Sequence, residues 1–196
     1  LAHLVNAQLN PNLKIYLENS NEIWNTLYSQ HDYNNRQAEE YGITPQHNVA
    51  RRLLEVSEVF AEVFGTEQIN QRVLPVLCWW VNVPGDFGDM LDYIEANYGH
   101  PAQFISAMAA ATYVDGHIQA PFTVDQVIGT MFSSAEELKG PIKSLQKIAD
   151  EWGLSHITYE GGPDSRGAWP DYLGKETYTL ANRDPRIYDV ISLHLL

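Results

Sequence analysis

The sequence has 196 residues, of which 44% are hydrophobic, 11% aromatic and 19% charged, enough apolar material for one sizeable core and too much for a disordered chain. Its 25 acidic and 12 basic residues give a formal net charge of −13, which argues against nucleic acid or an anionic membrane surface as a partner. No apolar run approaches the roughly 20 residues needed to span a bilayer.

The first half of the chain predicts two strands separated by a helix. Residues 1–9 suit a short helix, and residues 13–19 alternate apolar and polar side chains as a strand does. Residues 35–64 carry helical spacing. Residues 72–81 are almost continuously apolar, as expected for a strand buried on both faces. This run contains Cys78, whose being the lone cysteine excludes an intrachain disulfide and predicts a buried thiol.

The second half repeats the same order of elements. We expect helices over 87–98, 123–129 and 134–152, a further helix from Asp184, and strands over 104–113 and 155–160. The alanines of 104–113 would also suit a helix. Strand followed by helix, four times over, predicts an α/β fold with a parallel sheet. The pattern fits half of an eight-stranded barrel or a small doubly wound sheet.

Both ends of the sequence fall within helical patterns. Residues 1–5 have the composition of a helix already under way, and residues 190–196 stop on an apolar helical face. We therefore expect residues 1–196 to be a single partial domain of a longer protein, truncated at both ends. No signal peptide is visible in the sequence.

Two strand ends carry glutamates in distinctive contexts. Asn21-Glu22 follows the strand at 13–19, within Ser20-Asn21-Glu22-Ile23-Trp24-Asn25, and Glu160 ends the strand at 155–160 before Gly161-Gly162. Either motif alone is more often a satisfied polar residue or a surface charge. Their combination is informative because the carboxyl ends of parallel barrel strands build the active site.

These motifs resemble the large clan of retaining β/α-barrel glycoside hydrolases, in which Asn-Glu ends strand four and a second glutamate ends strand seven. The resemblance covers nearly the whole chain and implies a partial (β/α)8 TIM barrel, roughly from strand 4 to helix 7. It implies that Glu22 is the acid/base, that Asn21 bonds the sugar 2-hydroxyl and that Glu160 is the nucleophile. It also implies secretion to the extracellular space or periplasm, and a carbohydrate substrate with β-glycosidic bonds.

Strand alternation and connectivity agree with this assignment. Tyr16 and Glu18 share one side of their strand with Glu22, and in the fourth strand His156 shares a side with Glu160, so the polar sides are expected to line the barrel interior. Two strands lie between the glutamates, so they would end strands that face each other across a closed barrel. We expect their carboxyls to lie about 5–5.5 Å apart, as a retaining mechanism requires.

Other side chains are candidates for contacts around these carboxyls. Tyr113 is a candidate hydrogen-bond donor to Glu160, His31 a substrate contact, and the tryptophans stacking platforms for sugar rings; ordinary packing is the competing role for each. The candidate platforms are Trp24, Trp79, Trp80 and Trp169. No metal or cofactor is expected, since no metal-ligand spacing occurs. The remaining strands of the barrel, one to three and eight, are the expected protein partner.

Two other hypotheses fit the same residues. One is a carbohydrate-binding barrel that keeps the cleft without turnover. The other is an unrelated α/β domain in which the Asn-Glu and Glu-Gly-Gly motifs are coincidental. Glycosidic hydrolysis remains the first hypothesis because it uses both glutamates.

Overall fold

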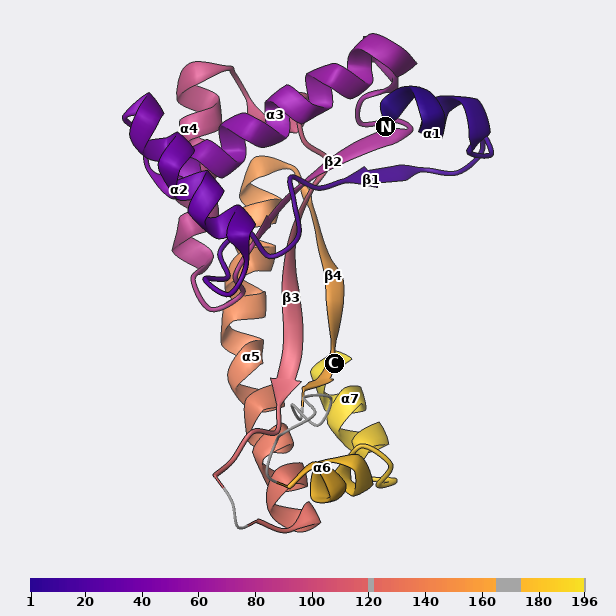
Figure 1. The fold of residues 1–196 in the computed structure, drawn as a ribbon, viewed down its shortest axis with the longest axis vertical. Helices are drawn as coiled ribbons and strands as arrows, with labels where there is room; N and C mark the ends of the chain where they lie inside the picture. The colour runs from indigo at the N-terminus through magenta and orange to yellow at the C-terminus, as the bar shows by residue number, and fades with distance from the viewer. Residues whose placement is uncertain (120–121, 165–173, 196) are drawn as a thin grey trace. The chain divides into compact units, whose positions relative to one another are not determined.

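A computed structural model describes residues 1–119, 122–164 and 174–195 (Figure 1). Its helices are α1 (Ala2–Gln8), α2 (Ser29–Tyr41), α3 (Pro45–Phe64), α4 (Pro84–Asn97), α5 (Val124–Trp152), α6 (Lys175–Ala181) and α7 (Ile187–Leu195). Its strands are β1 (Ile15–Leu17), β2 (Val73–Trp79), β3 (Ala107–Asp115) and β4 (Ser155–Asp164). Short 3₁₀ turns, η1 (Thr66–Gln68) and η2 (Pro101–Gln103), precede β2 and β3.

The four strands form one sheet in the order β1-β2-β3-β4. β1 pairs with β2 in parallel, and β2 pairs with β3 in parallel. The predicted α/β class with a parallel sheet is therefore confirmed. A doubly wound sheet reverses its strand order at a switch point, whereas these strands follow one another consecutively. The consecutive order is the one that a segment of a barrel would have.

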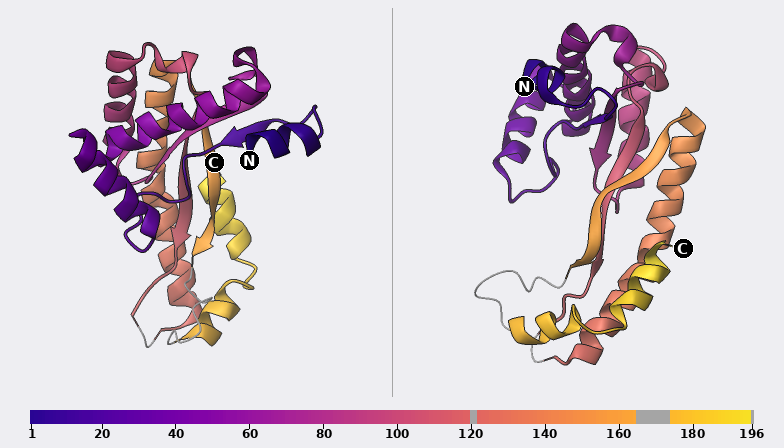
Figure 2. Two further views of the ribbon diagram at one scale, coloured as in Figure 1. Left: turned by 45° about the horizontal axis from the view of Figure 1, so that its top comes forward. Right: turned by 90° about the vertical axis from the view of Figure 1, so that its right-hand side faces the viewer.

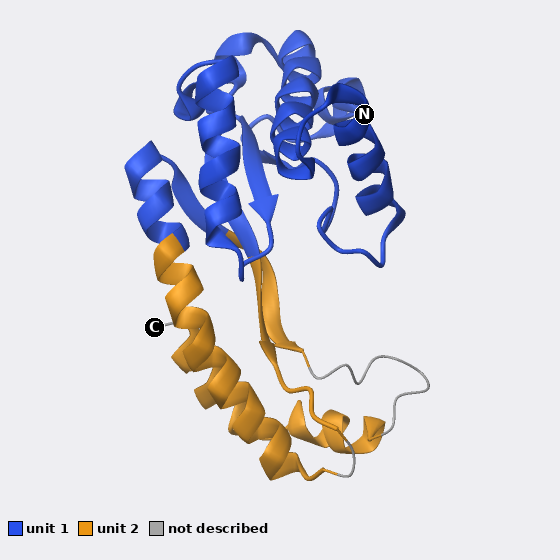
Figure 3. Cartoon of the chain, turned by 90° about the vertical axis from the view of Figure 1, so that its left-hand side faces the viewer, with its two compact units in different colours: residues 1–110, 145–157 blue, residues 111–144, 158–196 orange. Residues whose placement is uncertain are grey.

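The chain divides into two compact units (Figure 3). The first unit comprises residues 1–110 and 145–157, and the second comprises residues 111–144 and 158–196. The division cuts β3, α5 and β4, so each of these elements contributes to both units.

Packing in the first unit follows the alternation of its strands. Leu17 of β1 lies in an apolar cluster with Ala2 of α1, Phe60 of α3 and Val73 of β2, while Tyr16 on the opposite side is 63% exposed. Helices α3 and α4 pack on β2 and on each other, as the views of Figure 2 show. The helices therefore cover one face of the β1–β2 pair, and on the other face Tyr16 is exposed while its partner Leu74 is buried.

The second unit is held by contacts around the last part of β3. The Ser134 hydroxyl accepts from the Asp115 amide at 2.8 Å, and the Gly116 amide donates to the carbonyl of Asp164 at 2.8 Å. The fully buried Tyr178 of α6 exchanges 3.2 Å hydrogen bonds with the backbone of Ile118. In the described part of the chain, no helix is both long and apolar enough to cross a membrane.

Two predicted helix boundaries were wrong for identifiable reasons. The helix predicted over 35–64 is divided into α2 and α3, because Gly42 takes a left-handed conformation and Thr44-Pro45 starts a new helix with a Thr44 cap. The helices predicted over 123–129 and 134–152 are one helix, α5, which accommodates Pro141 internally. The strand conformation of β3 is confirmed against the helical alternative.

Candidate functional site

The backbone of the loop after β1 is unusual at two positions. Ser20 has φ +68° and Glu22 has φ +43°, in the left-handed region that side chains other than glycine rarely adopt. Such conformations cost on the order of 1–3 kcal/mol and persist only where the surrounding structure fixes them. The segment from residue 18 to residue 28 therefore needs strong local support, and the structure supplies it.

Glu22 is held from its C-terminal side by a tight turn. The Asn25 amide nitrogen Nδ2 donates to Glu22 Oε2 at 2.8 Å, and the Asn25 backbone N–H donates to the carbonyl of Glu22 at 2.9 Å. Ile23, between them, is only 5% exposed. The half-buried carboxyl thus stands on a turn that is anchored in the core by its neighbour.

Helix α2 supports the same loop from its first turn. Gln30 Nε2 donates to the carbonyl of Asn21 at 2.7 Å. His31 Nδ1 lies 3.3 Å from the carbonyl of Ile23, and His31 Nε2 lies 2.9 Å from Asn35 Nδ2. Both contacts are satisfied by a neutral ring with its proton on Nδ1, since Nε2 then accepts from the amide. In this state both ring nitrogens of His31 support the loop.

Aromatic side chains surround the loop on the side of β2. Trp24 meets Trp79 edge to face, with ring centroids 6.1 Å apart, and the Trp79 indole donates to Asp86 Oδ2 at 2.8 Å. Trp79 is buried, whereas Trp80, just past the end of β2, is 47% exposed. Trp80 and the half-buried Trp24 therefore keep part of their side chains exposed, whereas Trp79 is part of the core and offers no stacking platform.

The other predicted carboxyl, Glu160, is half-buried and lies within β4, which continues for four residues beyond it, so the prediction that the strand ends at Glu160 was wrong. A Cβ on the following Gly161 would lie 2.9 Å from Thr112 Oγ1 and 3.0 Å from the Thr112 carbonyl. In a regular strand the Cβ points away from the neighbouring strand, so this geometry marks an irregularity directly after Glu160. Gly162 continues it with φ +119°.

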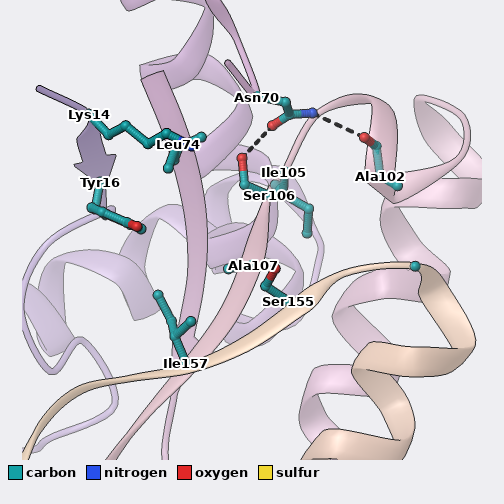
Figure 4. Close-up of a pocket in the computed structure, with 11 residues that line it drawn as sticks. Lys14, Tyr16, Asn70, Leu74, Ala102, Ile105, Ser106, Ala107, Ser155 and Ile157 are labelled. Atoms are coloured by element: carbon teal, nitrogen blue, oxygen red, sulfur yellow. Dashed lines mark hydrogen bonds between the residues drawn. The ribbon is translucent and has the colours of Figure 1, made fainter. Parts of the chain in front are cut away.

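A pocket of about 360 Å³ opens at the N-terminal ends of the strands in the first unit (Figure 4). Asn70, itself left-handed at φ +62°, donates to the carbonyl of Ala102 at 3.0 Å and accepts from the Ser106 hydroxyl at 2.6 Å. Figure 4 shows Tyr16 and Ile157 pointing into this space from β1 and β4. Glu22 follows the opposite, C-terminal end of β1, so this pocket is not its immediate surroundings.

The pocket corrects one expectation about β4. Ser155 and Ile157 line the same pocket as Tyr16, so the first part of β4 turns its odd-numbered side chains to the face of Tyr16, the reverse of the predicted alternation. His156 consequently faces the other way. Burial lowers its pKa from the usual 6.5, and the charge of Asp150 on α5 partly opposes this shift. Glu160 shares the face of Tyr16 only if the alternation shifts between residues 157 and 160.

The predicted site residues are distributed over both units. Asn21, Glu22, Trp24, His31 and Trp80 belong to the first unit, and the structure brings Glu22, Trp24 and His31 together in one loop and its supporting helix. Tyr113, which is 39% exposed, and Glu160 belong to the second unit. The Glu22–Glu160 separation and the Tyr113–Glu160 hydrogen bond stay predictions, and Trp169 lies outside the described residues.

Sequence reasoning missed three supporting residues of the Glu22 loop. Asn25, Gln30 and Asp86 make contacts that depend on the conformation of the loop and on the packing of β2. Asn25 alone carried a local signal, because an asparagine side chain often forms a turn by bonding the backbone two residues further on, as Asn25 does with Leu27. Within the described residues, no cluster of three histidine, cysteine or acidic side chains is arranged to bind a metal.

No family model, no curated protein and no solved structure matches the chain. The conclusions about function therefore depend on the geometry above and on the resemblance of the two motifs.

Proposed function

We propose that the chain is part of the catalytic barrel of a retaining glycoside hydrolase that cleaves β-glycosidic bonds in a polysaccharide or oligosaccharide. The four consecutive parallel strands would be strands four to seven of a (β/α)8 barrel, with the other strands completing it. The observation that carries the proposal is the loop after β1. A half-buried carboxyl stands there on a left-handed, multiply supported turn two residues before the half-buried Trp24.

The proposed mechanism needs a protonated Glu22 and an ionised Glu160. In the first step a Glu160 oxygen attacks the anomeric carbon, the glycosidic C–O bond breaks, and Glu22 transfers its proton to the departing oxygen. In the second step Glu22 takes a proton from water, whose oxygen attacks the same carbon and releases Glu160. Two inversions give net retention. A polysaccharide substrate would place the protein in the extracellular space or periplasm.

The inverse alternation at the start of β4 favours a second candidate. With Ile157 on the face of Tyr16, a regular continuation of β4 would turn Glu160 away from that face. The second candidate is then a barrel that binds a carbohydrate through Trp24, Trp80 and the Glu22 loop but does not hydrolyse it. The irregularity at Gly161 and Gly162 follows Glu160, so it does not supply the shift between residues 157 and 160 that the catalytic alternative needs.

The test assays the full-length protein on a panel of β-linked polysaccharides, together with Glu22→Ala, Glu160→Ala, Glu160→Gln and the exposed-helix control Glu39→Gln. We expect hydrolysis of at least one polymer, a loss of at least about 10³-fold in the Glu160 variants, and no loss in the control. Activated aryl glycosides with azide assign the roles. Glu22→Ala is expected to yield the β-glycosyl azide, and Glu160→Ala the α-glycosyl azide.

Two results would contradict the catalytic proposal. Hydrolysis that survives Glu160→Gln removes the nucleophile. Binding to a polymer without any hydrolysis, weakened by Trp80→Ala, would establish the binding barrel instead.

A further inference from the structure

Asn25 has a defined place in the chemistry of Glu22. We propose that Asn25 is a positioning residue that holds Glu22 Oε2 and thereby selects Oε1 as the oxygen that delivers the proton to the leaving group. This inference rests on the proposed function and deepens it.

Three contacts fix the orientation of the Asn25 side chain. Its Oδ1 accepts from the Leu27 amide at 3.0 Å, so the group that faces Glu22 is the Nδ2 amide, a donor. The backbone N–H of Asn25 is bonded to the carbonyl of Glu22 at 2.9 Å. Because an N–H of the main chain can only donate, the amide cannot be reversed without losing both side-chain contacts.

The donor on Oε2 distinguishes the two oxygens of Glu22. Nδ2 at 2.8 Å from Oε2 already places a hydrogen against that oxygen. The carbonyl-type oxygen of a protonated carboxyl is the better acceptor, so the acidic hydrogen belongs on Oε1. Oε1 is then the atom that gives its proton to the glycosidic oxygen and later takes one from water. The amide itself neither gains nor loses a proton in either step.

The loop is built to keep this arrangement. Glu22 has φ +43°, and its neighbour Ile23 is 5% exposed, so the backbone that carries the carboxyl cannot relax independently of the core. Gln30 and His31 bond the carbonyls on either side of Glu22 at 2.7 and 3.3 Å. With the backbone fixed, the side-chain torsions of Glu22 are the remaining freedom, and the hydrogen bond from Asn25 restricts them.

The experiment uses Asn25→Asp, which keeps an acceptor for the Leu27 amide and replaces the donor to Glu22 Oε2 with a carboxyl oxygen. Asn10→Asp is the matched control, because Asn10 Oδ1 accepts from the Asn12 amide at 3.0 Å in a turn outside the Glu22 loop. The full-length protein is assayed with 2,4-dinitrophenyl and phenyl β-glycosides of glucose, xylose, mannose and galactose. Melting temperatures show which variants remain folded.

The expected result depends on the leaving group. Dinitrophenolate leaves without a proton, so Asn25→Asp is expected to lower its kcat/KM less than about twofold. Phenolate needs the proton, and a fall of about tenfold or more is expected there. Glu22→Ala is expected to show the same dependence more strongly, and Asn10→Asp none.

Each alternative outcome has a distinct meaning. Equal losses on both glycosides in a folded Asn25→Asp variant would overturn the positioning role of Asn25. If Glu22→Ala shows the leaving-group dependence and Asn25→Asp does not, this inference fails and the proposed function stands. If Glu22→Ala shows none, or the wild-type protein turns over none of the glycosides, both fail.

Discussion

The two backbone segments that carry Glu22 and Glu160 are fixed by different physical means. Glu22 follows a strand of three residues, and its loop is held by hydrogen bonds and by the buried Ile23. Glu160 lies within a strand of ten residues, followed by a glycine whose backbone approaches Thr112 closely. The Glu22 segment is held by contacts of neighbouring side chains, whereas the Glu160 segment depends on a glycine that has no side chain. Truncating a side chain should therefore disturb the first segment, and adding a methyl group should disturb the second.

The largest effect is expected at the anchor of the Glu22 loop. Ile23→Ala removes a buried side chain and is expected to lower the free energy of unfolding by about 2–4 kcal/mol. Leu27→Ala in the same loop, where Leu27 is 75% exposed, is expected to change it by less than about 0.5 kcal/mol. Urea denaturation compares the two. Equal effects would mean that Ile23 does not hold the loop.

Addition of a methyl group at Gly161 tests the close approach of β4 to Thr112 next to Glu160. Gly161→Ala would press a Cβ against the Thr112 carbonyl at 3.0 Å, and backbone there cannot give way cheaply, so a loss of about 1–3 kcal/mol is expected. Gly129→Ala in α5 meets nothing within 4 Å and is expected to stabilise by about 0.5–1 kcal/mol. Opposite signs in thermal unfolding would confirm the close approach; a neutral Gly161→Ala would refute it.

The left-handed backbone before Glu22 predicts a smaller, stabilising effect. Ser20→Gly relieves the strain of φ +68° but makes the unfolded chain more flexible, and the net gain expected is about 0.5 kcal/mol. Ser29→Gly, in the first turn of α2, lacks that strain and is expected to destabilise by up to about 1 kcal/mol. Chemical denaturation measures both. Destabilisation by Ser20→Gly would contradict the strained geometry.

The smallest effect concerns pH and compares the two units. Burial lowers the pKa of His156 in the first unit and of His194 in the second, where His194 Nε2 lies 3.0 Å from Thr112 Oγ1. Below about pH 6.5 these two histidines bind protons more readily in the unfolded chain than in the folded one. The free energy of unfolding is therefore expected to decrease as the pH falls below about 6.5. Melting temperatures at about pH 7.5 and pH 5.5 test this prediction.

The matched variants separate the two histidines. His156→Gln and His194→Gln are each expected to reduce the drop in melting temperature, and His3→Gln, an exposed change on α1, to leave it unchanged. If neither buried variant alters the drop, acid sensitivity arises elsewhere.

The sequence predicted the fold where the hydrophobic pattern was unambiguous. β2 is fully buried and was predicted as such, and Tyr16 and Leu17 take the predicted opposite faces. The sides of β4 were predicted wrongly because His156 is a polar residue on the side away from the pocket, while Ile157 lines it. A polar residue indicates the solvent-facing side of a strand only where it is exposed, and His156 is half-buried near Asp150 of α5.

The sequence predicted the prominent residues of the candidate site but not the hydrogen bonds that hold them in place. Glu22 and Trp24 stood out by residue type and spacing. The contacts of Asn25 and Gln30 to the loop depend on the left-handed conformations at Ser20 and Glu22, which no propensity of serine or glutamate favours. Conformations imposed by tertiary packing are invisible to local patterns, and so are the partners that they bring into reach.

The positive φ of Glu22 also bears on engineering for heat resistance. Glycine and asparagine tolerate that conformation better than glutamate does, so a library screened only for survival at high temperature would enrich them at position 22. The winners would have lost the carboxyl. Under the proposed function, a screen for folded protein and a screen for product would therefore select different residues at position 22.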